Sequence, residues 1–195
     1  CSVAGSTRVS NFLGSGDTKG ADLAAKVSVT CAFLLSTLMG CILIFTPHSF
    51  FPSFFTPDEN VISEASRLLP LLALYVVGDG IQISLNAIIK ACGKQYVMMP
   101  IVVVAYWVVG VPLGYYITFI RHDGYMCEDS YFCGVTGLVM GLTTGTYVHM
   151  LLLAIVVVCS TNWEVESRKA KERLALEKHT KVTHQEDNQV DMRSI

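Results

Sequence analysis

Four long runs of apolar residues, separated by short polar connections, dominate the chain of 195 residues. They cover residues 27–46, 68–89, 97–120 and 134–159 and contain a single formal charge, Asp79. Each run has about 20 residues or more, and a helix of that length crosses a hydrocarbon layer of about 30 Å. Helices buried in a soluble protein keep a polar outer face, and these runs have none. The pattern predicts an all-α, polytopic membrane helix bundle without β-sheet.

The charges lie mostly outside these runs. Only 15% of the residues are charged, against about 25% in a soluble domain. We therefore expect a transmembrane part at 1–159, which opens with the end of an earlier span at 1–11, and a charged cytosolic tail at 160–195. Because the pattern starts in mid-element at Cys1, we expect a longer chain that has been truncated. The net charge of −2 gives no basic field for nucleic acid.

Lysine and arginine fall mainly on one side of the expected membrane. Twelve of the fourteen precede the first run, join the second run to the third, or lie in the tail; the other two are Arg67 and Arg121. Basic connections remain in the cytosol. The tail is thus expected to be cytosolic, in a multi-pass protein of the plasma membrane or of a vacuolar or other internal membrane.

Two cysteines lie in the connection after Arg121, which this orientation places outside. Cys127 and Cys133 could form a short-loop disulfide there or remain two unpaired thiols, and the sequence leaves both open. No Cys/His spacing is typical of a zinc site. No metal and no cofactor are therefore expected.

Asp79 is the strongest functional candidate. It lies about eleven residues from either end of its run, which is roughly 16 Å deep at 1.5 Å per residue. An ionised carboxylate at that depth costs at least a few kcal/mol, and intramembrane acids usually mark a proton, ion or substrate path. The alternative is an acid that only holds neighbouring helices together. We expect Asp79 to bind the coupling proton or cation.

Polar residues share one helical face with Asp79. Tyr75 precedes Asp79 by four residues, and Gln82, Asn86 and Lys90 follow it by three, seven and eleven. These spacings are positions on one side of a helix. Such a stripe lines either a water-filled cavity or a polar helix interface. Tyr75, Gln82 and Asn86 are candidates for contact with a substrate.

The third and fourth runs carry further candidates. Tyr106 begins an aromatic stretch with Trp107, Tyr115 and Tyr116 that either lines a pocket for organic cations or anchors the helix at the interface. Residues 110–114, GVPLG, predict a kink. In the fourth run, Gly137, Gly141 and Gly145 predict close helix packing, and His149 either forms a hydrogen bond between helices, which we favour, or relays protons.

The order of several short motifs resembles the multidrug and toxic compound extrusion (MATE) family. Residues 8–16, RVSNFLGSG, are similar to its R-V-[SG]-N-x-L-G-[AS]-G signature, and the resemblance ends at Trp163-Glu164, which is similar to the T-x-W-x-x-E that closes its twelfth helix. Between them the resemblance follows residues 69–71, 80–82, 90–95 and 106–114.

That resemblance implies part of the C-terminal lobe of a twelve-helix exporter, with the four runs as helices nine to twelve. Asp79 then falls where the family has an acidic residue in its tenth helix, while Lys90 replaces a commoner Arg and His149 stands where Gln is expected. It further implies export of small organic compounds, cationic in our expectation, in exchange for H⁺ or Na⁺. A missing N-terminal half would then be needed for transport.

Two other classes are open at this stage. A lipid or polysaccharide flippase of a related superfamily would need cations along its cavity, and Lys90 is the only candidate. A four-span scaffold or adhesion protein is disfavoured by its short outer connections and by Asp79. An enzyme is not expected, because the runs hold no paired catalytic acids, no HExxH and no Ser/Lys dyad.

Overall fold

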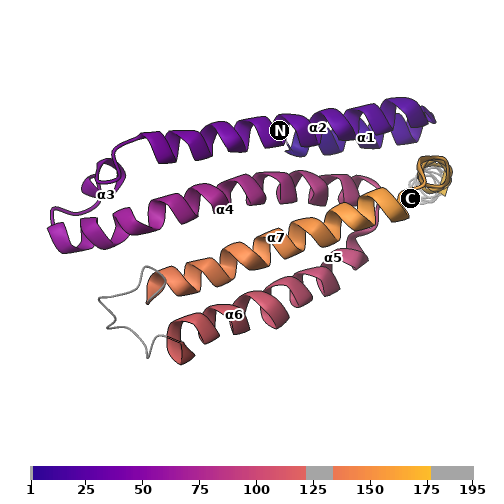
Figure 1. Cartoon of the computed structure of the whole chain (residues 1–195). Coiled ribbons are helices and arrows are strands. Elements are labelled where there is room, and N and C mark those ends of the chain that lie inside the picture. Colours follow the sequence, from indigo (N-terminus) through magenta and orange to yellow (C-terminus); the bar gives the residue numbers. More distant parts are fainter. Residues whose placement is uncertain (1, 122–133, 177–195) are drawn as a thin grey trace, which may run out of the picture.

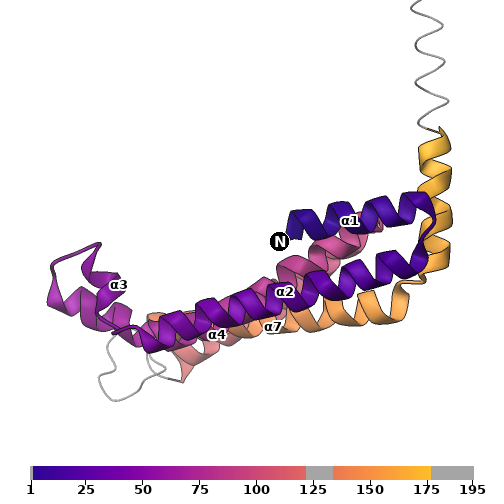
Figure 2. The same ribbon diagram turned by 90° about the horizontal axis from the view of Figure 1, so that it is seen from above.

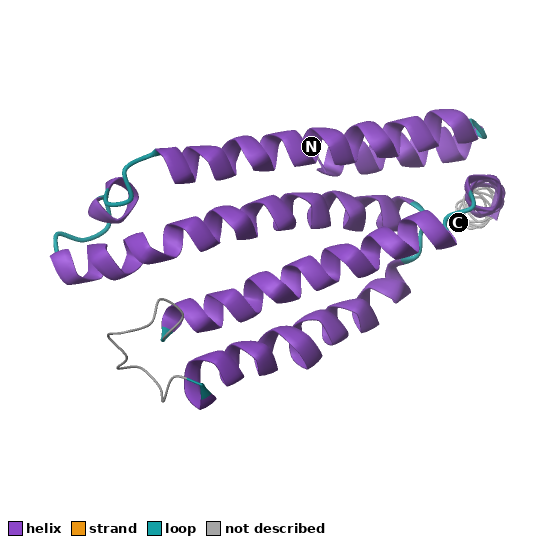
Figure 3. Ribbon diagram, in the orientation of Figure 1, coloured by secondary structure: helices purple, strands orange, loops and turns teal. Residues whose placement is uncertain are grey.

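The computed structural model describes residues 2–121 and 134–176, and its regular elements there are all helices (Figure 3). A final helix at 163–176 follows α7. The all-α prediction is confirmed. The preceding elements are α1 (Ser2–Ser15), α2 (Thr18–Phe45), α3 (Phe50–Ser53), α4 (Glu59–Ala91), α5 (Gln95–Val102), the π-helical η1 (Val103–Gly110), α6 (Val111–Tyr115), the π-helical η2 (Tyr116–Ile120) and α7 (Val135–Ser160).

Four of the described helices are long and apolar enough to cross a membrane, at Thr18–Phe45, Glu59–Ala91, Gln95–Ile120 and Val135–Cys159. The first two begin nine residues before the apolar runs that predict them, because polar residues cap them. Asp17 accepts a hydrogen bond from the Gly20 amide, and Asp58 accepts one from the Asn60 amide. An N-cap satisfies a free amide of the first turn, so the helices extend into polar sequence.

Successive long helices run in opposite directions (Figure 1). α4 packs against α1, α2 and α7, and α7 packs against α5, η1, α6 and η2. α1 lies alongside α2, as the rotated view shows (Figure 2). The end of the bundle where α1, α4 and α7 terminate is called the tail end below, and the opposite end is called the α3 end.

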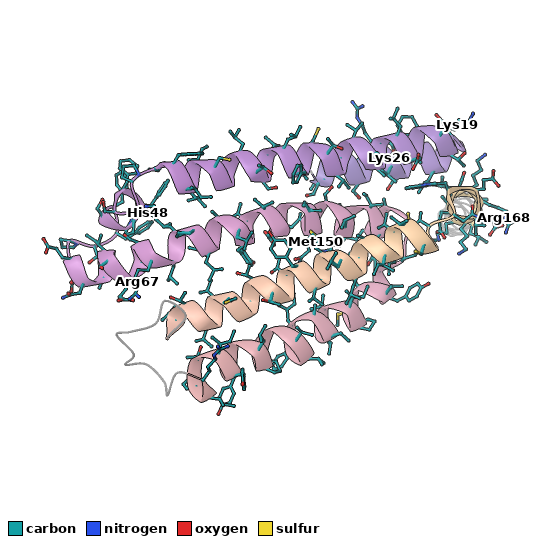
Figure 4. The ribbon with its side chains drawn as sticks, viewed as in Figure 1. Lys19, Lys26, His48, Arg67, Met150 and Arg168 are labelled. Atoms are coloured by element: carbon teal, nitrogen blue, oxygen red, sulfur yellow. The ribbon has the colours of Figure 1, made fainter. Side chains whose placement is uncertain are left out.

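Labelled side chains illustrate how charge is distributed between the two ends. Lys19, Lys26 and Arg168 lie at the tail end, whereas His48 and Arg67 lie at the α3 end (Figure 4). The separation agrees with the lysine and arginine count along the sequence.

Small side chains form the contact between α2 and α4, while large apolar side chains face outward. Leu34 of α2, for example, is 60% exposed. Small residues let membrane helices approach closely, and the outward aliphatic surface suits lipid. The buried residues of α2 are all small: Ala21, Ala25, Ser28, Ala32, Ser36 and Gly40.

The final helix lies across the tail end of the bundle (Figure 2). Trp163 and Ala170 pack on a core cluster that contains Leu13 and Cys92. Glu166, only 4% exposed, forms an ion pair with Lys94 at 3.1 Å. α7 ends at Ser160, and the first part of the expected tail packs on the helices of the bundle.

Further contacts join this helix to the ends of α1 and α4. Ser167 Oγ donates to the Leu13 carbonyl at 3.1 Å. Lys171 lies against Gly16, and Arg173 against Gly93; both glycines have positive φ, +90° and +71°. Cations are favourable beside the free carbonyls of a helix C-terminus. The final helix thus fastens the ends of α1 and α4 together.

Candidate functional site

Asp79 lies midway along α4, between two glycines in close contact with other helices. A Cβ atom at Gly78 would lie 3.1 Å from the Tyr147 ring of α7, and one at Gly80 would lie 2.5 Å from Cβ of Ser36 in α2. The glycines therefore hold this part of α4 between its two neighbours. Asp79 is half-buried, and no described cation forms an ion pair with it.

Tyr106 connects α4 to α7 beside Asp79. Its hydroxyl donates to Gln82 Oε1 at 3.3 Å and lies 3.1 Å from the hydroxyl of Thr146. Since Tyr106 has one proton to give, Thr146 is the donor of the second bond. Tyr75 and Asp79 lie on the same face of α4 as Gln82, within two helical turns of it. Three helical segments therefore meet in one group of polar side chains.

His149 lies beside this group, one turn after Thr146. Its ring stands edge-on to Tyr106, with centroids 5.7 Å apart and an interplanar angle of 81°. The residue is 2% exposed, and neither ring nitrogen has a hydrogen-bond partner within the described residues. The favoured interhelical hydrogen bond is therefore not formed here. The term polar cluster refers below to Tyr75, Asp79, Gln82, Tyr106, Thr146 and His149.

Glycine contacts bring the segments of the polar cluster together. A Cβ atom at Gly141 would lie 2.5 Å from the Gly110 carbonyl oxygen, and one at Gly145 would lie 3.1 Å from the Ala105 carbonyl oxygen and the Tyr106 ring. The prediction of close packing is confirmed for these two glycines.

The expected kink in the third span takes the form of wider turns. In η1 the amide of Val111 donates to the carbonyl of Tyr106, five residues earlier. Pro112, which follows, has no amide proton to give. π-Helical turns of this kind occur frequently at functional sites, and this one contains Tyr106.

The polar residues predicted to share one face of α4 belong to two separate sites. Tyr75 and Gln82 belong to the polar cluster, whereas Asn86 and Lys90 line a cavity of about 300 Å³ between α1 and α4. The Oδ1 atom of Asn86 has no partner within the described residues. The cavity wall contributed by α1 includes the hydroxyls of Ser2, Ser6 and Thr7.

The aromatic residues of the third span do not face one common site. Tyr106 points inward, but Trp107 is 71% exposed, and Tyr115 and Tyr116 are exposed as well. These four residues do not form a common pocket, and the outer three suit a lipid surface. Cys127 and Cys133 lie outside the described residues.

Sequence reasoning missed Thr146 and Tyr147. Thr146 bonds Tyr106, and the hydroxyl of Tyr147 donates to the Leu74 carbonyl at 2.9 Å. A usable signal was present, since both precede His149 within one helical turn and follow the glycine at 145. The described residues contain no group of three or more His, Cys, Asp or Glu side chains that could hold a metal ion.

Four apolar helices long enough to cross a membrane, with a polar cluster where three helical segments meet, indicate an integral membrane protein. A family model described as MatE matches residues 1–116. The chain belongs to the MatE family, whose members are transporters.

Individual relatives agree with this assignment. The chain is 36% identical to Protein DETOXIFICATION 4 of Arabidopsis thaliana over 87% of its own length and 33% of the relative. It is 34% identical to Protein DETOXIFICATION 29 of the same plant, over 87% and 31%. The crystal structure of the eukaryotic MATE transporter AtDTX14 matches with a TM-score of 0.77 and 29% identity, over 87% of this chain and 35% of that one. The chain thus spans about a third of the relatives it matches.

Proposed function

We propose that this chain is the C-terminal part of a secondary active antiporter that exports small organic compounds in exchange for H⁺ or Na⁺, with Asp79 as the coupling carboxylate. The observation that carries the proposal is the position of Asp79. It is half-buried in mid-span, without an ion-pair partner among the described residues, beside a hydrogen-bonded group of polar side chains.

The chemistry follows from the free energy of the charged carboxylate. In the absence of a bound cation, an ionised acid at this depth is costly, so the carboxylate favours uptake of a proton or a cation from the aqueous side. When an outgoing compound competes for the same space, binding of one releases the other. Alternating exposure of the site to the two sides then converts an ion gradient into export.

Organic cations are the proposed substrates, because a carboxylate and an adjacent tyrosine ring attract positive charge. The charge distribution supports a cytosolic tail end, with Lys19, Lys26 and Arg168 on that side. Export from the cytosol would then begin at this end of the bundle.

The test uses the transport-competent protein that contains this chain, reconstituted in proteoliposomes at matched protein amounts. Flux of radiolabelled tetraethylammonium is driven by an imposed pH or Na⁺ gradient. Asp79→Asn retains shape and hydrogen bonding but cannot titrate, and its flux should fall about tenfold or more, within the range of measured coupling free energies. The matched control is Asp22→Asn, a half-exposed acid near the start of α2 that pairs with Lys26. Undiminished gradient-driven flux in Asp79→Asn removes Asp79 from the mechanism, and poor assembly of the variant with unchanged coupling indicates a structural role.

A further inference from the structure

We propose that His149 is a second proton acceptor of the transport cycle, placed in the same polar cluster as Asp79. The proposal rests on the proposed antiport function and adds to it a residue in a different helix. The proton would come from the aqueous side and form one N–H bond, which converts the neutral ring into an imidazolium; no other bond changes.

The first argument is the state of the neutral ring. Both nitrogens are buried without hydrogen-bond partners among the described residues. A buried polar group that lacks a hydrogen-bond partner is costly. Because the described residues leave only 2% of His149 exposed, helices from elsewhere in a longer protein have almost no surface of this residue left to contact. A purely structural position would be filled at lower cost by an apolar side chain.

The second argument is the environment of the protonated ring. Its centroid lies 5.7 Å from that of Tyr106, and the two rings are nearly perpendicular; a cation over the face of an aromatic ring is attracted to it within about 6 Å, so the charge of the imidazolium would act at close range on Tyr106. The Tyr106 hydroxyl is fixed by Gln82 and Thr146. Proton uptake by His149 would therefore act on a side chain that already spans α4 and α7, and any shift of the Tyr106 ring would move both bonds.

The third argument is the set of charged and titratable groups around α7. On α4, Tyr75 and Asp79 lie on the face that carries Gln82. η1 contributes Tyr106. Tyr96 of α5, Tyr115 of α6 and Tyr116 of η2 are exposed, and Tyr147 of α7 is bonded to the Leu74 carbonyl. At the ends of α4, Arg67 pairs with Glu64, and Lys90 is exposed. Asp79 is thus the one formal charge in mid-span among these described elements, so no cation there opposes a proton on His149.

The experiment compares the pH profile of gradient-driven tetraethylammonium flux for the wild type, His149→Gln and the control His48→Gln, whose histidine is exposed at the α3 end. Glutamine hydrogen-bonds but does not titrate in this range. The ratio of flux at pH about 6 to flux at pH about 8 should change about fivefold or more in His149→Gln and remain at the wild-type value in His48→Gln. A His149→Gln profile that overlaps the wild type overturns the proposal.

A second measurement does not depend on transport or on the stability of the variant. In the wild-type protein in bilayers, with ¹⁵N-labelled histidine, the imidazole signal of His149 should move from the neutral to the protonated position between pH about 8 and about 5. A signal that remains at the neutral position overturns the proposal. Absence of gradient-driven flux in the wild type would instead contradict the antiport function, and the imidazole titration would still decide the state of His149.

Discussion

Lys94 and Glu166 form a buried ion pair, 3.1 Å apart, between the turn after α4 and the helix that follows α7. Both residues are less than one tenth exposed, and Lys169 approaches the same Glu166 oxygen at 3.5 Å. Taking two charges out of water is costly, and the removal of one partner leaves the other uncompensated. The pair therefore makes the attachment of the final helix specific to this register.

Glu166→Gln should destabilise the protein by about 3 kcal/mol, because it leaves Lys94 buried opposite a neutral amide. The unfolding midpoint in detergent should fall accordingly. The double change Lys94→Glu with Glu166→Lys should recover part of the loss. The control is Asp22→Asn, which breaks the exposed pair with Lys26 and should cost less than about 1 kcal/mol. Equal midpoints for Glu166→Gln and Asp22→Asn would show that the buried pair contributes nothing.

Gly141→Ala should disturb the contact between the third and fourth spans, because the added methyl would lie 2.5 Å from the backbone of Gly110 and Gly114. Overpacking of this kind costs about 1–3 kcal/mol. Gly114→Ala is the matched control in the same contact, since its methyl would find its nearest atoms at 3.5 Å. The measurement is the unfolding midpoint of both variants, and a smaller loss in Gly141→Ala than in Gly114→Ala would contradict the packing argument.

Much of this architecture could be predicted from the sequence because membrane spans follow from hydropathy and length alone. The spans, their order and the separation of charge agree with the structure. The helix starts could not be predicted from apolar runs, since Asp17 and Asp58 extend α2 and α4 into polar sequence by capping. The packing of the final helix on the bundle was also missed. A run that mixes Glu, Lys and Arg is typical of a solvent-exposed segment, and the sequence alone does not show that Glu166 pairs with Lys94.

The polar cluster was predictable in part. Tyr75, Asp79 and Gln82 share one face of α4 by periodicity, and Tyr106 was a candidate for its chemistry. Which helix would face them was not predictable, since Thr146 reaches Tyr106 only through the glycine contacts of α7. For the same reason, the stripe could not be divided in advance between this cluster and the cavity that contains Asn86.

The Cys92 thiol should make stability depend on alkaline pH. Burial, and then the charge of Glu166, raise its pKa from 9.0 to about 11, against smaller opposing effects of Lys94 and Arg173. The folded state therefore holds this proton more tightly than the unfolded state does. Its contribution to stability is complete below pH about 9 and is lost as the pH rises through about 11.

Unfolding midpoints measured from pH about 8 to about 11 test this for the wild type, Cys92→Ala and Cys159→Ala. Between pH about 9 and about 10 the wild type should lose on the order of 1 kcal/mol more than Cys92→Ala. Cys159, which is exposed at the end of α7, should have no such effect, so Cys159→Ala should follow the wild type. Parallel curves for all three proteins would show that folding does not change the pKa of Cys92.

Tyr106→Phe isolates the hydroxyl that joins α4 to α7. Phenylalanine keeps the ring beside His149 but removes the donor to Gln82 and the acceptor for Thr146, both of which are buried. A buried polar group that loses its partner costs about 1–3 kcal/mol, so the unfolding midpoint should fall by a corresponding amount. Tyr116→Phe is the control, because the Tyr116 hydroxyl belongs to an exposed side chain near the C-terminal end of the same span.

The same pair of variants separates stability from coupling. A Tyr106→Phe protein that has lost stability but still shows full gradient-driven flux would make the hydroxyl a structural contact. If instead flux at matched amounts of folded protein falls several-fold, while Tyr116→Phe transports normally, the hydroxyl takes part in coupling. The second result is expected. Tyr106 holds Gln82 and Thr146 in place near Asp79. A change in their positions would alter the space that the ion and the exported compound share.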